Sequence, residues 1–554
     1  MAETSEKENN APNRYLIISF SVLLFVLVTS IIVLSLVPPV SRDALTHHLA
    51  IPKLYLKHGG VYEIPFLRFS YYPMNLDLLY LIPLYFGNDI VPKLIHFFFA
   101  ALTAWLIYRF LGGRIGKAYG LVGALFFLSI PIIIKLSITI YVDLGLIFFS
   151  TASLFLILKW KDSGFQLKYL VASGVFCGLA LGTKYNGLIT FFLLNLFIPY
   201  LQSRYGKNEK SRTVNILFST GAFFVISLLI FSPWMIRNFI WTNNPIFPLY
   251  NSFFNHVNQV QTATGHEFDP FTVRRLLFNE SWWEMALLPI RIFFQGQDNS
   301  PQYFDGRLNP FLLIFSFFAF SLSKNDDSRE KLDKLVLLIF SVLFFVFALF
   351  STGVRIRYLS PIIPPIVILS IYGIRDMIRV VGNLEYRMTR KLGVLSICVM
   401  VLYSFWLNGI YIIEQFKKVA PISYLSSEIT RDEYIEKYRP EYGAIKYINQ
   451  NLPDNSKILL IFVGKRGYYL DRDYLAGVNI IEKVMKEAAS EKEILREIRE
   501  RGITHFLVRY KLFAGWVNNN MNEENKAILD KMFKNNFKLM YKEHGYGLFR
   551  MATN

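Results

Sequence analysis

One acid stands directly after the first long apolar run of the chain. Asp43 lies in the stretch SRDALTHHLAIPKLYLKHGG, residues 41–60. A carboxylate at this point has two interpretations. Asp just before ALTHHL is a common helix N-cap. A carboxylate within reach of a hydroxyl can also act as a general base and take its proton. Position alone favours neither interpretation.

A second acid, Asp143, stands in SITIYVDLGLIFF at the edge of another apolar run. An ionisable residue at the edge of a membrane span predicts function, and its alternative is a capping or snorkelling acid. If Asp43 and Asp143 share a membrane face, one can serve as base while the other orients the acceptor or a metal. Glycosidases also use two carboxylates, but hydrolysis by water needs no large membrane scaffold and is less favoured.

Sparse cations accompany these acids. Three belong to the motifs LGTKYNGL, SPWMIRNFIWTNN and TGVRIRYLSPIIPP, and a fourth follows Asp43 in the first stretch: Lys184, Arg237, Arg357 and Lys57. Where water is scarce, cations stabilise the charge that develops on a departing phosphate. The alternative for each is a headgroup-facing residue at a helix end. The pattern predicts a site for a phosphate leaving group.

Histidines are the candidate metal ligands. His47 is followed by His48, and His266 is followed by Glu267, but neither pair has a spacing typical of a metal site. No cofactor is predicted with certainty, and a divalent metal bound by His47, His266 and Glu267 stays an open alternative.

The composition indicates a membrane protein. Of the 554 residues, 53% are hydrophobic and only 18% are charged, whereas a soluble protein carries about a quarter charged residues. Apolar runs long enough to span a bilayer recur from Tyr15 to about Ile413 and then stop. The net charge of +18 does not indicate nucleic acid binding, because the cations gather in short loops between apolar runs, where they set membrane orientation.

These basic loops predict a topology with the N-terminus in the cytoplasm. Residues 1–14 form a cytoplasmic tail, 15–413 a transmembrane domain and 414–554 an extracytoplasmic domain. The transmembrane domain is expected to hold about eleven helices, near 15–37, 90–110, 118–135, 140–160, 168–183, 186–202, 213–232, 309–322, 335–351, 358–375 and 392–413.

The same topology places all the singled-out charges on the outer side. The segment 75–88 is apolar but short and contains Pro83, so we expect an interfacial, non-spanning helix in the first outer loop. With that assignment every basic loop stays inside, and both acids and all four cations face outward.

The residues after 414 have ordinary soluble composition. A helix pattern at 442–451 leads to the strand-like KILLIFVG, and a charged amphipathic segment leads to the strand-like ITHFLVRY. Alternation of helices and strands predicts a small α/β domain.

Five segments in order, DALTHHLAIPKLYLKHGG, YVDLGL, GTKYNGL, SPWMIRNFIWTNNPIFPLYN and RIRYLSPIIPP, resemble the integral-membrane glycosyltransferases of the GT-C fold. The branch is similar to protein O-mannosyltransferases and the lipid A aminoarabinose transferase. The resemblance implies a GT-C bundle with interfacial helices in its first outer loop and inverting sugar transfer from a polyprenyl-phosphate donor.

The resemblance also assigns residues. The catalytic acid of the family's first outer loop corresponds to Asp43, the second outer acid to Asp143, the lysine of a TKG-like motif to Lys184 and the arginine after a Pro-Trp pair to Arg237. Two positions depart from the family pattern, because Tyr185 replaces the usual Gly and Ala44 replaces a frequent second acid. The second departure leaves metal dependence open.

We therefore expect a polyprenyl-phosphate-sugar-dependent glycosyltransferase of the bacterial inner membrane, acting on a lipid, protein or glycan acceptor hydroxyl at the outer face. The alternative is a transporter or flippase of a lipid-linked sugar, which uses the same cations but needs no base. Paired halves in hydropathy are frequent in transporters, and the sequence shows none.

Overall fold

The computed structural model describes residues 2–206, 212–255, 270–322, 326–351, 353–482 and 491–552. The chain divides into two compact units. The helical unit comprises Met1–Leu36, Tyr71–Leu79 and Val91–Pro421, and the tail unit comprises Val37–Ser70, Tyr80–Ile90 and Ile422–Asn554. Two parts of the first outer loop, Val37–Ser70 and Tyr80–Ile90, thus fold together with the tail, which is far away in sequence. The side of the membrane on which they lie stays a prediction.

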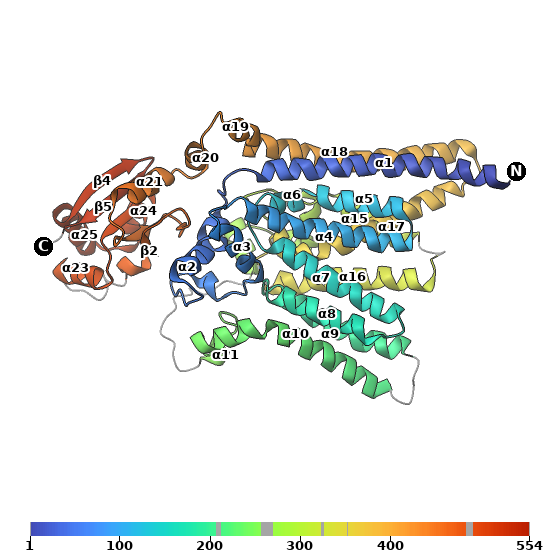
Figure 1. Ribbon diagram of the computed structural model, residues 1–554, viewed down its shortest axis with the longest axis horizontal. Coiled ribbons are helices and arrows are strands. Elements are labelled where there is room, and N and C mark those ends of the chain that lie inside the picture. Colours follow the sequence, from blue (N-terminus) through green and yellow to red (C-terminus); the bar gives the residue numbers. More distant parts are fainter. Residues whose placement is uncertain are drawn as a thin grey trace. The chain divides into compact units, whose positions relative to one another are not determined.

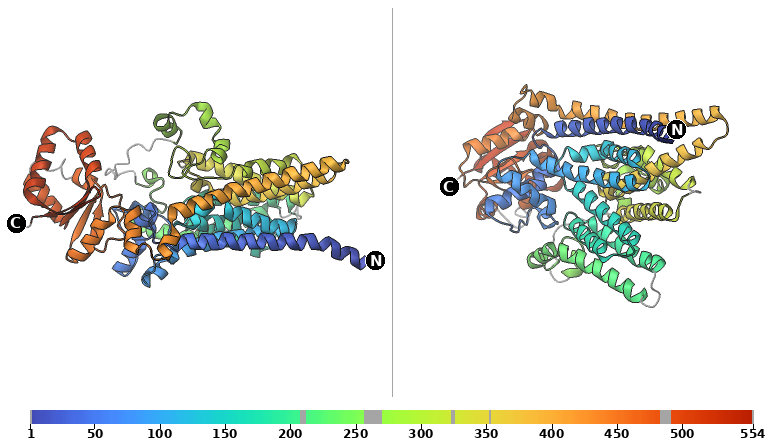
Figure 2. Two further views of the ribbon diagram at one scale, coloured as in Figure 1. Left: turned by 90° about the horizontal axis from the view of Figure 1, so that it is seen from above. Right: turned by 45° about the vertical axis from the view of Figure 1, so that its right-hand side comes forward.

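The helical unit is a bundle of long apolar helices. In Figures 1 and 2 its first and last long helices, α1 and α18, run side by side. Its elements are α1 (Ala2–Ser35), α4 (Val91–Arg114), α5 (Lys117–Ser129), α6 (Pro131–Ser137), α7 (Asp143–Asp162), α8 (Leu167–Leu181), α9 (Gly187–Tyr205), α10 (Arg212–Thr242), α11 (Asn251–Phe254), α12 (Pro270–Phe278), α13 (Trp282–Ala286), α14 (Leu288–Phe294), α15 (Phe311–Ser321), α16 (Ser328–Ser351), η4 (Ile356–Ile362), α17 (Ile363–Gly382) and α18 (Arg387–Val419).

Every one of the predicted spans holds a helix, but fewer than eleven qualify as spans. Seven helices of the described residues are long and apolar enough to cross a membrane, or eight if α5 and α6, which meet at an angle of 67°, form one span. The expected ranges 168–183 and 309–322 hold the shorter helices α8 and α15, and 186–202 holds α9, with 19 residues. The expected count of about eleven was therefore too high by this criterion.

Close helix approach explains several small residues inside the bundle. A Cβ added to Gly373 of α17 would lie 1.8 Å from the carbonyl oxygen of Phe315 in α15, and one added to Gly178 of α8 would lie 2.6 Å from that of Ser227 in α10. Membrane helices pack largely through such close contacts, because lipid supplies no hydrophobic driving force between them. These two positions admit only glycine without a shift of the helix backbones.

A buried ionic cluster ties α16 to α17 at the ends next to the predicted inner loops. The Lys334 ammonium lies 2.5 Å from Asp326, 2.9 Å from Glu330 and 2.7 Å from Asp376. The three carboxylates are close enough to share a metal ion, but the ammonium already lies among them. Arg375 pairs with the same three acids. Arg379 pairs with Asp326 and Asp376, so three cations face three acids. The cluster is structural, since these charges neutralise one another.

The tail unit is built on a five-stranded sheet of order β2-β1-β3-β5-β4. Strand β1 runs parallel to β2 and β3, whereas β5 is antiparallel to β3 and β4. The elements after the bundle are α19 (Pro421–Leu425), α20 (Arg431–Tyr438), α21 (Tyr442–Asn451), β1 (Lys457–Ile461), β2 (Asp473–Ala476), α23 (Glu491–Glu500), β3 (His505–Arg509), α24 (Tyr510–Asn520), α25 (Glu523–Asn536), β4 (Phe537–Glu543) and β5 (Tyr546–Met551).

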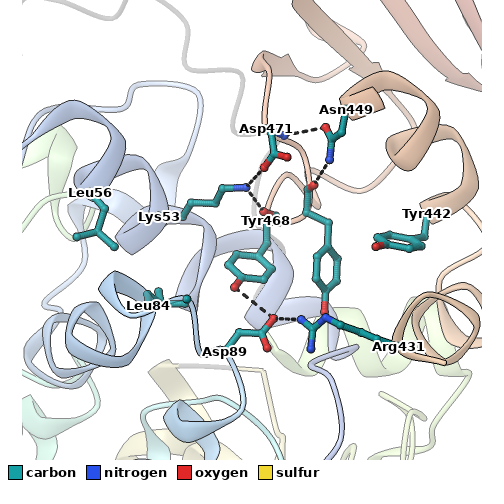
Figure 3. Close-up of a pocket in the computed structure, with 11 residues that line it drawn as sticks. Lys53, Leu56, Leu84, Asp89, Arg431, Tyr442, Asn449, Tyr468 and Asp471 are labelled. Carbon is teal, nitrogen blue, oxygen red and sulfur yellow. Dashed lines mark hydrogen bonds and ion pairs between the residues drawn. The ribbon is translucent and has the colours of Figure 1, made fainter. Parts of the chain in front are cut away.

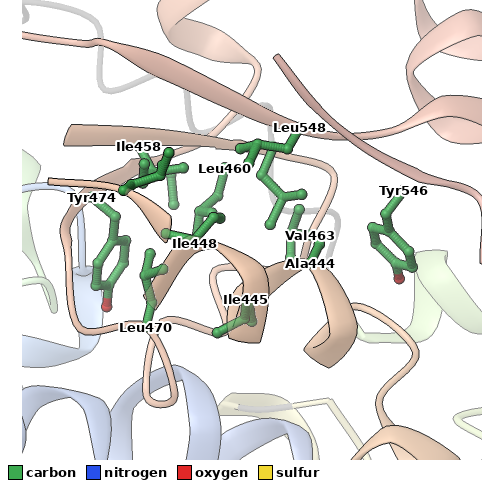
Figure 4. Close-up of a cluster of buried hydrophobic side chains, with 13 residues drawn as sticks. Ala444, Ile445, Ile448, Ile458, Leu460, Val463, Leu470, Tyr474, Tyr546 and Leu548 are labelled. Atoms are coloured by element: carbon green, nitrogen blue, oxygen red, sulfur yellow. The ribbon is translucent and has the colours of Figure 1, made fainter. Parts of the chain in front are cut away.

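Helices cover both faces of this sheet. Because side chains alternate along a strand, Leu459 and Ile461 of β1 pack with α23 and α25, whereas Ile458 and Leu460 pack with α21. Figure 4 shows the second cluster, in which Ile445 and Ile448 lie under the strands. The predicted α/β tail is confirmed. The domain boundary after 413 stays a prediction, and α18 continues to Val419.

The first outer loop contributes short helices. They are η1 (Ala44–His48), α2 (Ala50–His58), η2 (Arg68–Tyr71) and α3 (Asn75–Tyr85). Helix α3 has 11 residues and rises only about 16 Å, about half of a bilayer core. Its length agrees with the non-spanning interpretation.

Replacing Lys334 with Met is expected to lower the free energy of unfolding by about 3 to 5 kcal/mol, because it leaves the acids buried without their shared ammonium. The measurement is thermal unfolding of the full chain in detergent. Lys534→Met is the matched control, because Lys534 pairs with Asp530 on the surface of α25, and we expect a change below about 0.5 kcal/mol there. Equal melting temperatures for the two variants would contradict a stabilising role.

The buried His505 predicts that the stability of the tail unit depends on pH. Its side chain is 4% exposed, and burial, with a smaller effect of Arg550, lowers its pKa from 6.5 to about 4. The folded state therefore favours the neutral ring, whereas the unfolded chain takes up a proton below about pH 6.5. The free energy of unfolding should therefore fall between pH 6.5 and pH 4, by up to roughly 1.4 kcal/mol per pH unit. Hydrogen-exchange protection of β3 amides measures this loss. His505→Gln should flatten the profile, and an unchanged slope would show that another group titrates.

Candidate active site

The centre of the candidate site is a buried ion pair in the helical unit. Asp143 is the first residue of α7 and only 1% exposed. Lys184, in the turn between α8 and α9, places its Nζ 2.6 Å from Asp143 Oδ1 and keeps its side chain 21% exposed. The positive end of the helix dipole also favours an acid at this position. Two residues selected separately from the sequence therefore form one ion pair.

His96 of α4 holds the beginning of α7. Its Nε2 accepts a hydrogen bond from the Leu144 backbone N–H at 3.0 Å. Its Nδ1 lies 3.0 Å from the carbonyl oxygens of Leu136 and Thr139, so this pattern fits a neutral ring with its proton on Nδ1. The imidazole satisfies a backbone donor that no preceding turn can pair, and so fixes the residue next to Asp143.

Arg357 joins the pair from η4. Its guanidinium lies 5.1 Å from the ring centroids of both Tyr141 and Tyr358, and it acts electrostatically on Asp143. The Lys184 ammonium lies 4.9 Å from the Tyr358 ring. Tyrosine faces attract cations. The start of α7, the turn at Lys184 and η4 therefore meet, and they bring two cations to one carboxylate.

Arg237 has a different setting on α10. Its guanidinium lies between Trp234 and Trp241, at 4.6 and 4.9 Å from their rings. It donates to the backbone carbonyls of Tyr71 at 2.7 Å and Tyr72 at 3.1 Å. These contacts fasten α10 to the segment that precedes α3. The contact of Arg237 with a phosphate stays a prediction. In addition, Arg237 positions the segment that precedes α3.

Tyr185 explains the departure from glycine in the GTKY motif. Its hydroxyl donates to the Phe247 carbonyl at 2.8 Å and accepts from Asn238 Nδ2 at 3.1 Å. Burial raises the pKa of Tyr185, so the phenol stays protonated and can donate. The side chain ties the Lys184 turn to α10 and to the loop that follows it.

The remaining sequence candidates lie in the tail unit. Asp43 precedes η1, but its side chain makes no capping hydrogen bond there, which weakens the N-cap interpretation. The Lys57 ammonium lies 2.6 Å from Asp473, so a role in phosphate binding would have to compete with this pair. Asp43 and Asp143 belong to different units, and their cooperation stays a prediction.

Of the metal candidates His47, His266 and Glu267, only His47 lies among the described residues, so metal binding stays a prediction. His47 is buried, with Nδ1 2.9 Å from Thr46 Oγ1 and its ring stacked on Phe69. His266 and Glu267 lie outside the described residues. Neither carboxylate cluster with metal-like spacing in the described part of the chain includes Asp43, Asp143 or His47. No catalytic step is therefore assigned to a metal.

Four residues of the site escaped the sequence analysis: His96, Asn238, Tyr141 and Tyr358. His96 and Asn238 were detectable in principle, because each is a polar residue within an apolar run. The two tyrosines are sequence neighbours of the singled-out Asp143 and Arg357, but only the fold shows that their rings face cations.

Comparison with known proteins agrees with this geometry. Residues 64–243 match the family model "PMT: Dolichyl-phosphate-mannose-protein mannosyltransferase", a range that contains Asp143, Lys184 and Arg237. A comparison with curated proteins finds no match.

Two similar solved structures cover nearly the whole chain. ArnT from Cupriavidus metallidurans bound to undecaprenyl phosphate aligns with a TM-score of 0.56 and 14% identity, over 96% of this chain and 97% of that one. The archaeal oligosaccharyltransferase AglB from Archaeoglobus fulgidus, in complex with an inhibitory peptide and a dolichol-phosphate, aligns with a TM-score of 0.53 and 12% identity, over 96% and 74%. Residues 64–243 of the chain are therefore similar to the dolichyl-phosphate-mannose-protein mannosyltransferase family, and the chain has the GT-C fold of these structures.

Proposed function

We propose that this protein transfers a sugar from a polyprenyl-phosphate donor to an acceptor hydroxyl, with inversion, at the outer face of a bacterial inner membrane. The observation that carries the proposal is the ion pair of Lys184 with the buried Asp143 at one end of an apolar bundle, where Lys184 and Arg357 both lie against the Tyr358 ring. The ArnT structure is bound to undecaprenyl phosphate and the AglB structure is in complex with a dolichol-phosphate, which supports the donor class.

The proposed reaction needs one base and cations for the leaving phosphate. Asp43 takes the proton of the acceptor hydroxyl. The oxygen attacks the anomeric carbon opposite the phosphate, and the bond from that carbon to the phosphate oxygen breaks. The polyprenyl phosphate leaves as an anion and needs no general acid, while Lys184 and Arg357 stabilise its charge.

Asp143 supports this step through Lys184. A lysine side chain has four flexible carbons, and the buried carboxylate restricts where its ammonium can lie. Arg357 is restricted by the rings of Tyr141 and Tyr358. Both cations are therefore held in place before the donor arrives, which avoids reorganisation during the reaction.

Asp43→Asn should reduce sugar transfer by about 10² to 10⁴, because the amide keeps the shape but loses the basic oxygen. The measurement is transfer of labelled sugar from polyprenyl-phosphate donors in membranes. Donor affinity should stay unchanged, and the surface variant Asp530→Asn is the control. Full turnover in Asp43→Asn would disprove the assignment of the base. If the wild type and Asp43→Asn both move donor across the bilayer and neither consumes it, the flippase alternative is established.

Arg357→Gln should weaken donor binding by about 10 to 150-fold, the loss expected for a hydrogen bond to a charged group. Lys184→Met should weaken it similarly and also destabilise the fold, because Asp143 is left buried and unpaired.

The double variant Asp143→Asn/Lys184→Met separates these two effects. Its melting temperature should recover towards that of the wild type, while its donor affinity stays low. If donor affinity recovers together with stability, Lys184 acts only on folding and the phosphate assignment is wrong.

A further inference from the structure

The tail unit contains a pocket that the proposed reaction does not use. It has a volume of about 340 Å³, within the range of small-molecule sites. Its wall combines residues of the first outer loop with residues of the tail, as Figure 3 shows. We call it the tyrosine pocket, after three of its main lining residues, Tyr442, Tyr468 and Tyr469.

The charges in the tyrosine pocket neutralise each other. The Lys53 ammonium donates hydrogen bonds to the carbonyl of Tyr468 at 2.8 Å, to the carbonyl of Leu470 at 3.1 Å and to the Asp471 carboxylate at 2.8 Å. An ammonium has three donors, and these contacts occupy them. Arg431 lies 2.5 Å from Asp89. The pairing leaves little attraction for an anionic ligand.

The same groups form an alternating set of donors and acceptors. Asp89 also accepts from the Tyr468 hydroxyl at 3.3 Å, and Asn449 donates to the Tyr469 carbonyl and accepts from the Asp471 backbone N–H. A sugar hydroxyl is itself both a donor and an acceptor. Each carboxylate has more lone pairs than these bonds use, so Asp89 and Asp471 can also accept hydrogen bonds from the hydroxyls of a neutral polyol.

Flat aromatic surfaces complete the pocket. The Tyr442 ring lies edge to face with the Tyr469 ring at 5.3 Å, and Tyr468 and Tyr469 lie at 5.0 Å. Leu56 and Leu84 add an apolar wall. Aromatic rings offer broad apolar area at low cost in conformational entropy, which suits the C–H face of a sugar ring.

Two of these tyrosines also contact the backbone around Asp43. The Tyr468 backbone N–H donates to the Leu45 carbonyl at 3.2 Å, and the Tyr469 hydroxyl donates to the Pro39 carbonyl at 2.8 Å. The pocket and the segment that carries Asp43 therefore share the Tyr468–Tyr469 pair within one unit. A ligand seated in the pocket is held next to the segment that carries the candidate base.

We propose that the tyrosine pocket binds a neutral saccharide portion of the acceptor, so that the acceptor is a glycan. The inference rests on the proposed transfer, because it supplies the hydroxyl that Asp43 deprotonates. In this pocket, acids neutralise the cations. The surroundings of Asp143, where we place the phosphate of the donor, are instead rich in cations.

The test is binding of the purified full chain in detergent to an array of neutral oligosaccharides of one to six hexoses. Phosphorylated and sialylated glycans and peptides are printed on the same array. The strongest neutral ligand is then titrated against two pocket variants. Asp471→Asn removes a carboxylate whose side chain is 58% exposed, and Tyr442→Leu removes a flat ring. Asp530→Asn is the matched surface control.

We expect a neutral glycan to bind the wild type and Asp530→Asn alike, with an affinity at least about tenfold weaker in both pocket variants. Size-exclusion profiles equal to the wild type show that the variants are folded. No bound glycan, preference for anionic glycans or peptides, or unchanged affinity in both pocket variants would overturn the proposal.

The pocket proposal and the transferase proposal can each be disproved without the other. If the wild type transfers sugar but binds no neutral glycan, the pocket assignment is wrong and the transferase proposal stands. If it binds a neutral glycan through the pocket but consumes no donor, the pocket assignment stands and the transferase proposal fails.

Discussion

A carboxylate buried at the first turn of a helix stays ionised only with a cation in contact, because desolvation of an unpaired charge costs several kcal/mol. At the start of α7 that cation is Lys184, 2.6 Å from Asp143. The requirement links the turn after α8 to the beginning of α7. His96 secures the adjacent backbone, and Tyr185 extends the link to α10. The geometry of the candidate site therefore depends on one ion pair.

The bundle contains a second group of buried charges with a different balance. Lys334 and Arg375 share Asp326, Glu330 and Asp376, so these charges largely neutralise one another. Around Asp143, Lys184 and Arg357 act on one carboxylate. Charges of the first kind stabilise helix packing, whereas a local excess of cations attracts an anion such as a phosphate. The same physical cost of burial thus serves structure in one place and, in our proposal, ligand binding in the other.

The tail unit gives the first outer loop its shape. Lys53 of α2 bonds to the turn at 468–471, and Tyr469 bonds to Pro39. The loop that carries Asp43 is therefore held by a domain that begins almost four hundred residues later in the chain. If Asp43 is the base that we propose, this arrangement gives a physical reason for the tail, because the tail positions the segment that carries Asp43 and forms a pocket beside it.

The sequence alone determined the features that depend on local pattern. Apolar run length predicted where helices lie, and alternation predicted the α/β tail. The basic loops predict the first outer loop and the tail on one side of the membrane, which stays a prediction. Sparse charges at apolar edges selected Asp143 and Lys184. The count of spans was less accurate, because α8 and α15 are helices too short to qualify by length and composition. Only the tertiary structure decided which charges pair, that Arg237 holds the backbone at Tyr71, and that Tyr468 joins a pocket to the segment of Asp43. Such contacts join residues far apart in the chain, and their energies depend on distances and burial that no local pattern contains.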